Sequence, residues 1–153
     1  MSARFTMALH ALGMMAWSEA RAPGEPLRSE DLARSINTNP VVVRRVLADL
    51  RRAGLVSTRR GVGGGVALAR PEARITLRMV WEALAAGERA ELIGRHPAGP
   101  NPACPIGRCV ADYLDGVYGK AETALKASFD GITLATVRRE LQARLDRAHP
   151  PHR

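Results

Sequence analysis

The segment 38–68, TNPVVVRRVLADLRRAGLVSTRRGVGGGVAL, constrains the fold of this chain more than any other part of the sequence. Asn39 suits the N-cap of a helix, and Pro40 suits the first helical position. Gly54 suits the position after a helix end, because glycine readily adopts the left-handed backbone that closes many helices. The segment therefore predicts a helix that ends after Ala53, followed by a sharp change of direction.

The predicted helix has one apolar side and one basic side when its residues are placed at about 100° each on a wheel. The apolar side consists of Val42, Val43, Val46, Leu47 and Leu50. The basic side consists of Val41, Arg44, Arg45, Ala48, Arg51 and Arg52. Arginine favours bidentate contacts with phosphate and guanine, whereas a face that needs only solubility usually mixes lysine with glutamate. The basic side thus indicates a helix that lies in the major groove of DNA.

A hairpin with a cationic tip follows this helix. Residues 55–58 and 66–68 read as two short strands, and between them lie Arg59, Arg60 and four glycines that include Gly64. Such a tip is typical of the wing in a winged helix-turn-helix. It resembles a phosphate-binding loop only superficially, because no GK[ST] follows and the loop joins two strands. No Ser/His/Asp set or pair of carboxylates has a telling spacing, so we do not expect an enzyme.

A short helix over SEDLARSI, with Ser29 as its predicted N-cap, precedes the basic helix. A break at Asn37 and Thr38 separates the two. Two short helices joined by a tight turn, the second of them basic, form the core of a helix-turn-helix. A first helix over residues 4–19 is predicted from apolar residues at helical spacing.

Three regions are predicted along the chain. Residues 1–86 form a winged helix-turn-helix DNA-binding domain, in which a helix begins at Thr76 and Trp81 belongs to the core. Residues 87–103, rich in glycine and proline, form a flexible sensor loop. Residues 104–153 form a dimerisation helix and a C-terminal helix. The predicted fold class is mainly α with a small β-wing.

The net charge of +8 is distributed unevenly. Residues 1–75 carry 12 basic and 6 acidic residues, a net +6, and residues 76–153 carry 11 and 9, a net +2. The excess accompanies the basic helix, as expected if double-stranded DNA is the partner. No apolar run approaches about 18 residues, no signal peptide is recognisable, and two cysteines make no secreted disulfide scaffold. We expect a cytoplasmic protein without membrane association.

A long helix is predicted from Pro105 to about Phe129, because proline suits a helix start. Its apolar stripe consists of Val110, Leu114, Val117, Ala121, Ala124, Leu125 and Ala127. Operators with two-fold symmetry need two readers, so this stripe is a natural seam of a homodimer. The alternative is that the helix packs against its own domain. A last amphipathic helix is predicted over residues 133–147.

The chain also resembles the Rrf-two family of winged helix-turn-helix regulators, which includes the iron–sulfur regulator IscR, the nitric oxide sensor NsrR and the cysteine-metabolism regulator CymR. The matching segments are SARFTMALHAL, TNPVVVRRVLADLRRAGLV, RGVGGGVALAR, ITLRMVWEAL and NPACPIGR, which together span nearly the whole chain. The resemblance implies a homodimeric bacterial transcription regulator, usually a repressor. By position, it implies that Asn39, Val41 and Arg44 reach bases and that Arg60 enters the minor groove. The helical wheel places Arg45 on the same outward face, where it could bind guanine or phosphate.

Many members of this family hold an iron–sulfur cluster on three cysteines, but this chain contains only Cys104 and Cys109. The three-cysteine cluster is therefore excluded, and the cofactor is left open. One hypothesis is a thiol sensor, because Cys104 precedes Pro105 and the positive end of a helix favours the reactive thiolate. A second hypothesis is a cluster or metal with mixed ligands, in which His10 of the other subunit is a third ligand beside Cys104 and Cys109. His96 could be a fourth ligand only if its loop folds back. The third is that both cysteines are structural.

A winged-helix module that binds proteins and senses no signal is the alternative function. Wings also bind protein partners, but the arginine face favours DNA. Titration with fluorescent random DNA would distinguish the two functions.

Overall fold

The computed structural model describes residues 3–85, 99 and 101–148. Within them, the elements follow in the order α1 Ala3–Arg21, α2 Ser29–Ile36, α3 Pro40–Arg52, β1 Val56–Arg59, β2 Gly65–Leu68, the 3-10 helix η1 Glu72–Arg74, α4 Leu77–Ala85, α5 Pro105–Asp130 and α6 Leu134–Ala148. This is a mainly helical architecture with a two-stranded sheet, so the predicted fold class is confirmed. Most of the predicted sensor loop, residues 87–103, lies outside the described residues. None of the described helices is both long enough and apolar enough to cross a bilayer.

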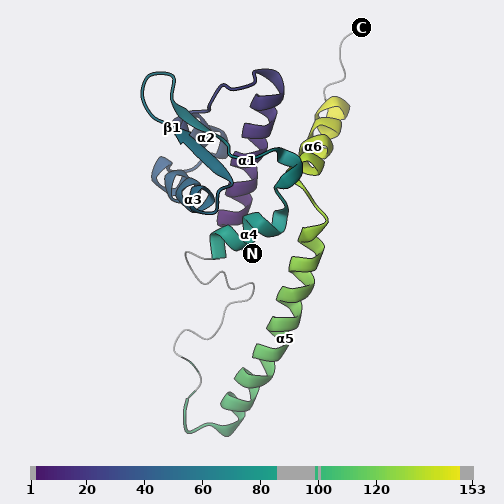
Figure 1. Ribbon diagram of the computed structural model, residues 1–153. Helices are drawn as coiled ribbons and strands as arrows, with labels where there is room; N and C mark the ends of the chain where they lie inside the picture. The colour runs from purple at the N-terminus through teal and green to yellow at the C-terminus, as the bar shows by residue number, and fades with distance from the viewer. Residues whose placement is uncertain (1–2, 86–98, 100, 149–153) are drawn as a thin grey trace.

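Helix α1 is the centre of the domain: α3 and the hairpin lie on one side of it, and α6 lies on the other (Figure 1). The side chains that are almost completely buried come from α1, α2, α3, α4, α6, β1 and the connections between them. The largest are Leu12, Leu32, Leu50, Leu55, Ile75, Leu134, Val43, Val46, Val56 and Val80. Burial of one such side chain contributes about 1.5–3 kcal/mol, so this core fixes α3 against α1.

Helix α2 spans the predicted residues SEDLARSI, but its N-cap lies one residue before the predicted one. Ser29 is the first helical residue, and the N-cap position belongs to Arg28, whose side chain makes no capping hydrogen bond. The Leu32 amide already donates to the Arg28 carbonyl, and the Ser29 hydroxyl donates to the carboxylate of Glu30 instead of accepting from the backbone. The predicted break after α2 is present, because Asn37 has φ 56° and ψ 54°, the left-handed conformation that ends a helix.

The hairpin is anchored to the domain at its base. β1 and β2 are antiparallel, with Val56 opposite Leu68 and Arg59 opposite Gly65. Leu27 extends this sheet, since its backbone exchanges hydrogen bonds of 2.8 and 2.7 Å with Val66. A Cβ on Gly65 would lie 2.4 Å from the Leu27 carbonyl oxygen, so only glycine allows this close approach.

Three aromatic rings join α1, α4 and α5. Phe5 stacks on Phe129 with ring centroids 5.2 Å apart and meets the edge of Trp81 at 5.6 Å. The prediction that Trp81 belongs to the core is confirmed, since 2% of the residue is exposed. The Thr76 hydroxyl accepts a hydrogen bond from the Met79 amide, which caps α4 where the sequence predicted its start.

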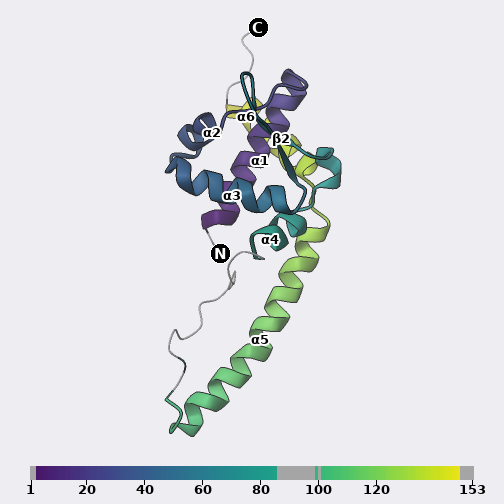
Figure 2. The ribbon, with the colours of Figure 1, turned by 60° about the vertical axis from the view of Figure 1, so that its left-hand side comes forward.

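Helix α5 points away from the rest of the molecule in two views (Figures 1 and 2). It begins at Pro105, as predicted, and no residue along its 26 residues is buried. Only its C-terminal end, around Phe129, packs against the core. The helix therefore does not pack along its own domain.

Candidate nucleic-acid interface

The start of α3 is fixed by its cap. Asn39 has an extended backbone, and its side-chain oxygen accepts a hydrogen bond from the Val41 amide at 2.8 Å. Pro40 occupies the first helical position, where it has no amide that would need a partner. Both assignments confirm the helix start that the sequence predicted.

The basic side of α3 faces solvent. Val41 is 49% exposed, although it is a large apolar residue. The other exposed residues of this face are Arg44, Arg45, Ala48, Arg51 and Arg52. Each residue that the wheel placed on the basic side is thus outward. On the apolar side Val43, Val46, Leu47 and Leu50 are buried, and Val42 is half-buried.

The four arginines of α3 differ in their partners. Arg44 Nη2 lies 3.4 Å from a carboxylate oxygen of Glu30 on α2. Arg52 forms an ion pair with Asp49, one turn earlier on the same helix. Arg45 and Arg51 have no side-chain partner among the described residues, so both guanidinium groups are available to a ligand.

Glu30 is kept ionised by several donors. Its pKa lies below the ordinary value, first because its own backbone amide donates to the carboxylate, then because Ser29 and Arg44 donate to it. The negative charge near the N-terminus of α2 also suits the positive end of the helix dipole. Glu30 thus orients Arg44 from the neighbouring helix.

The hairpin tip presents two more cations. Arg59 and Arg60 are exposed and have no side-chain partner in the described part of the chain. Val62, at the end of the tip, is fully exposed. A Cβ on Gly64 would lie 2.3 Å from the Arg59 carbonyl oxygen, so the turn that brings the arginines to the tip requires glycine there.

Helix α3 and the hairpin lie on the same side of α1, and α6 lies on the opposite side (Figure 1). The structure therefore brings the residues predicted to read DNA to one side of the domain: Asn39, Val41, Arg44, Arg45, Arg59, Arg60 and Gly64. A helix with a hairpin beside it on the same side of the domain is the arrangement expected of a reading helix with a flanking wing.

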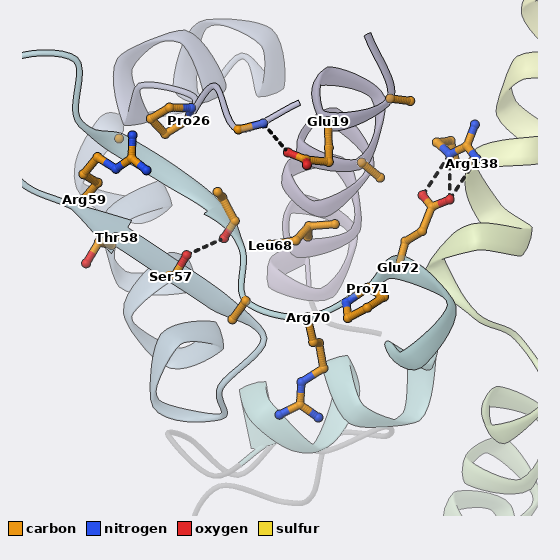
Figure 3. A pocket seen from close by; sticks show the side chains of 16 residues that line it. Glu19, Pro26, Ser57, Thr58, Arg59, Leu68, Arg70, Pro71, Glu72 and Arg138 are labelled. Carbon is orange, nitrogen blue, oxygen red and sulfur yellow. Dashed lines mark hydrogen bonds and ion pairs between the residues drawn. The ribbon is translucent and has the colours of Figure 1, made fainter. Parts of the chain in front are cut away.

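A groove of about 920 Å³ lies between the hairpin and the C-terminal part of α1 (Figure 3). Glu72 of η1 and Arg138 of α6 form its far wall, joined by three hydrogen bonds of 2.8 to 3.0 Å. These hydrogen bonds, and then the charge of Glu72, raise the pKa of Arg138 above its ordinary value. The ion pair ties α6 to η1, which follows the hairpin, and Arg59 and Gly65 of the hairpin also line this groove.

Sequence reasoning missed Asp49, which is buried on α3 and paired with Arg4 and Arg52. A signal was present, because the wheel of about 100° per residue places Asp49 within about 20° of Val42, at the edge of the apolar side. An acidic residue at that position has to be either exposed or neutralised.

The two cysteines lie at the end of α5 that is remote from the domain (Figures 1 and 2). Cys104 is the N-cap, as predicted, and its sulfur accepts a hydrogen bond from the Gly107 amide at 3.3 Å. Cys109 is exposed, and both cysteines are free thiols.

His10 is exposed on α1, and its Nε2 lies 3.2 Å from the hydroxyl of Ser35 on α2. Within one chain the structure does not bring His10 to Cys104 and Cys109, which lie on the distant end of α5. His96 lies outside the described residues.

A sequence model of the Rrf2 family, described as iron-dependent transcriptional regulator, matches residues 1–140. The chain belongs to the Rrf2 family. This is the Rrf-two family that the sequence motifs indicated, and the match spans α1 to the middle of α6.

Relatives of this Rrf2 chain agree in length and fold. YwnA of Bacillus subtilis (strain 168), assigned as an HTH-type transcriptional regulator, is 33% identical over 140 residues, which cover 92% of this chain and 98% of YwnA. A solved structure assigned as a DNA-binding protein has 29% identity and a TM-score of 0.64, covering 88% of this chain and 98% of that one. Two further structures share the fold at 20% identity. T. potens IscR has a TM-score of 0.66, and the match covers 100% of this chain and 93% of IscR. CymR of B. subtilis has a TM-score of 0.64, and the match covers 92% of this chain and 96% of CymR.

The Rrf2 chain is therefore a DNA-binding transcriptional regulator and not an enzyme. The description of the Rrf2 family as iron-dependent invites a test of whether its residues fit an iron centre. Iron–sulfur clusters are held by four cysteines or by cysteines with histidines. Among the described residues, no three His, Cys, Asp or Glu side chains lie close enough together to hold a metal ion. The described part of one chain does not provide an iron site, and His10 could join Cys104 and Cys109 only across two subunits.

Proposed function

We propose that this Rrf2 protein is a homodimeric repressor that binds DNA sequence-specifically, with α3 in the major groove and the hairpin tip in the adjacent minor groove. The outward face of α3 carries this proposal. An exposed Val41 stands there beside arginines, two of which lack a partner among the described residues. Arg45 and Arg51 on this surface can bind DNA without first breaking an ion pair that the described residues form.

Each residue of this surface has a proposed role. Asn39, Val41, Arg44 and Arg45 contact base edges: Val41 meets a thymine methyl group, and the arginines bind guanine or phosphate. Arg59 and Arg60 place the tip against the minor groove and its phosphates, and Gly64 provides the turn. These roles divide the surface into base contacts on α3 and positioning contacts on the hairpin.

Helix α5 supports the homodimer. Four large apolar side chains on it are 40 to 73% exposed: Ile106, Val110, Tyr113 and Val117. Their spacing of four, three and four residues repeats the pattern of a coiled-coil seam, which places them on one face of the helix. A second copy of α5 would cover this face and would pair two reading helices for a two-fold symmetric operator.

Selection of bound sequences from a random DNA library tests the proposal. The selected sites should contain an inverted repeat, and the affinity for them should fall steeply between 50 and 200 mM salt, by about 10³–10⁵-fold if six to ten phosphates are contacted. A reporter promoter that carries the selected site should be expressed less when the protein is present. A failure to enrich any sequence, or a flat salt response, would contradict the proposal.

The proposal includes a thiol response at Cys104. One molecule of hydrogen peroxide would oxidise Cys104 of one subunit to a sulfenic acid and release one water molecule. The Cys104 thiol of a second subunit would then attack this sulfur, forming the disulfide and releasing a second water molecule. A disulfide between Cys104 and Cys109 of one chain is disfavoured. The Cα atoms of residues five apart on a regular helix are about 8 Å from each other, which is farther than a disulfide spans. Such a bridge between subunits would change the geometry of the α5 pair and therefore the spacing of the reading helices.

Two measurements test the response. In the wild-type protein, peroxide treatment should abolish both the maleimide labelling of Cys104 and DNA binding. The Cys104→Ser variant should keep DNA binding under peroxide. The Cys109→Ser variant should lose DNA binding under peroxide, as the wild type does. Absorbance and metal content of anaerobically purified protein test the second hypothesis, a centre shared by Cys104, Cys109 and His10 of another subunit. Peroxide-insensitive binding with no metal would leave the cysteines structural.

A further inference from the structure

The reading helix α3 contains a buried charge. Asp49 is 6% exposed, and it is the only buried charged or polar residue in the described part of the chain. Its carboxylate pairs with Arg4 of α1 through one oxygen and with Arg52 of α3 through the other. The same helix therefore exposes cations outward and anchors one anion inward.

Arg4 has a fixed position of its own. It precedes Phe5, whose ring stacks on Phe129 of α5 with an angle of 8° between the planes and meets Trp81 of α4 edge-on. About a fifth of the Arg4 side chain is exposed, so most of its length is held in the packed start of α1. The guanidinium group that meets Asp49 is thus attached to a rigid part of the core.

The other buried side chains of α3 are apolar, namely Val43, Val46, Leu47 and Leu50. Apolar packing is non-directional, so it holds the helix in place but specifies its rotation about its axis less sharply than a hydrogen-bonded ion pair does. A rotation of about 10° moves a group at the helix periphery, about 5–6 Å from the axis, by about 1 Å. Such a shift is enough to spoil a bidentate contact between an arginine and a base.

We propose that Asp49 is a positioning residue for DNA recognition: through Arg4 it sets the rotation of α3, and thereby aims Arg44 and Arg45 at base edges. Asp49 itself does not touch DNA. This inference rests on the proposed placement of α3 in the major groove.

The test is the ratio of affinities for a selected DNA site and for random DNA. Asp49→Asn removes the charge while keeping the shape, so the selected site should be bound more weakly. Random DNA should be bound equally well or more tightly, because the protein gains one net positive charge. The ratio should fall by roughly tenfold, the equivalent of one lost base contact.

Glu140→Gln is the matched control. Glu140 is an exposed residue of α6, on the far side of α1 from α3, and its substitution makes the same change of charge. It should leave the ratio within twofold of the wild type. A fall of the ratio in this variant would assign the effect to net charge and would overturn the proposal.

Arg4→Gln provides a second, independent variant if Asp49→Asn melts below the assay temperature. It removes the other half of the ion pair and lowers the net charge by one, so random DNA should be bound more weakly. The ratio should nevertheless fall as in Asp49→Asn, because the rotation of α3 is released in both.

A ratio unchanged within twofold in the folded variants would overturn the proposal. Equal weakening on selected and random DNA would also overturn it, since a loss of folded protein reduces both affinities alike. A wild-type protein that prefers no sequence would instead contradict the proposed function itself, before any variant is compared.

Discussion

Among single residues, Arg44 is the one whose present partner competes with DNA. It shares its guanidinium with Glu30 at 3.4 Å, and more than half of each side chain is exposed. An exposed ion pair of this length is weak, so under the proposed placement of α3 DNA would replace Glu30 as the partner of Arg44 at little cost. Glu30 would then also repel phosphate and so limit the directions from which DNA approaches this end of α3.

We predict that Arg44→Ala weakens binding to the selected site by about 1–3 kcal/mol and relaxes the preference at one base position. Competition binding against a set of single-base variants measures both effects. Arg144→Ala, at an exposed position of α6, removes the same charge away from the interface and is the control. If Arg44→Ala weakens the affinity for selected and random DNA equally, Arg44 contacts phosphate and does not read a base.

Glu30 gives a prediction about pH. Its pKa is lowered in the folded protein, so its ionisation stabilises the fold above the unfolded value of 4.5, and this contribution is lost as the pH falls through the folded pKa. The carboxyl should titrate below 4.5 in an NMR experiment. Arg44→Ala should raise that midpoint only in part, because the backbone amide and Ser29 still donate. A midpoint at or above 4.5 in the wild type would contradict the assignment.

Among the elements, the hairpin combines a fixed base with a free tip. Leu27 pairs with Val66 and holds the base of β2 against the segment before α2. Arg59 lies at the end of β1 and Arg60 lies in the tip, and neither side chain forms a hydrogen bond or an ion pair with the described residues. Under the proposed function, this division would let the tip adapt to the width of a minor groove while the domain sets its direction.

We predict that Gly64→Ala weakens DNA binding while the melting temperature of the domain changes little. The added methyl group would clash with the Arg59 carbonyl oxygen and distort the turn, whereas the core residues lie elsewhere. Gel-shift titration and a thermal melt measure the two effects. Val62→Ala, at the fully exposed end of the tip, should change neither quantity. A large drop in melting temperature for Gly64→Ala would show that the tip is part of the folding unit.

For the whole molecule, α5 is the element that we propose joins the domains of two subunits. The Phe129 end of α5 is packed into the core next to Phe5 and Trp81, while the Cys104 end is remote from it. A change at the remote end can therefore reach the domain along a continuous helix. In a dimer, this geometry would connect the chemistry of the cysteines with the separation of the two α3 helices.

We predict that Val110→Glu makes the protein monomeric and weakens binding to an inverted repeat much more than binding to a half-site. The new charge would lie in the apolar seam of α5, where a partner helix would have to bury it. Sedimentation equilibrium and binding to both DNAs measure the outcome. Arg108→Glu introduces the same side chain on the opposite face of α5 and should stay dimeric. A dimeric Val110→Glu protein would place the seam elsewhere.

Local features of the sequence determined the elements and the identity of the outward residues. The Asn39 cap, the start of α5 after Cys104 and the burial of Trp81 followed from patterns within a few residues, and each is present. The arginine face of α3 followed from helical periodicity alone. The bounds of α2 were predicted correctly, but its N-cap was wrong by one residue, because the choice between Arg28 and Ser29 depends on which backbone amide forms the first helical hydrogen bond.

Only the tertiary structure decided which distant residues meet. Arg4 and Asp49 are 45 residues apart in the sequence, and Glu72 and Arg138 are 66 apart. No local period records such pairings, because they depend on how separate helices pack against one another. The sequence placed charges on helix faces, and the packing of α1 against α3 turned one of those charges inward.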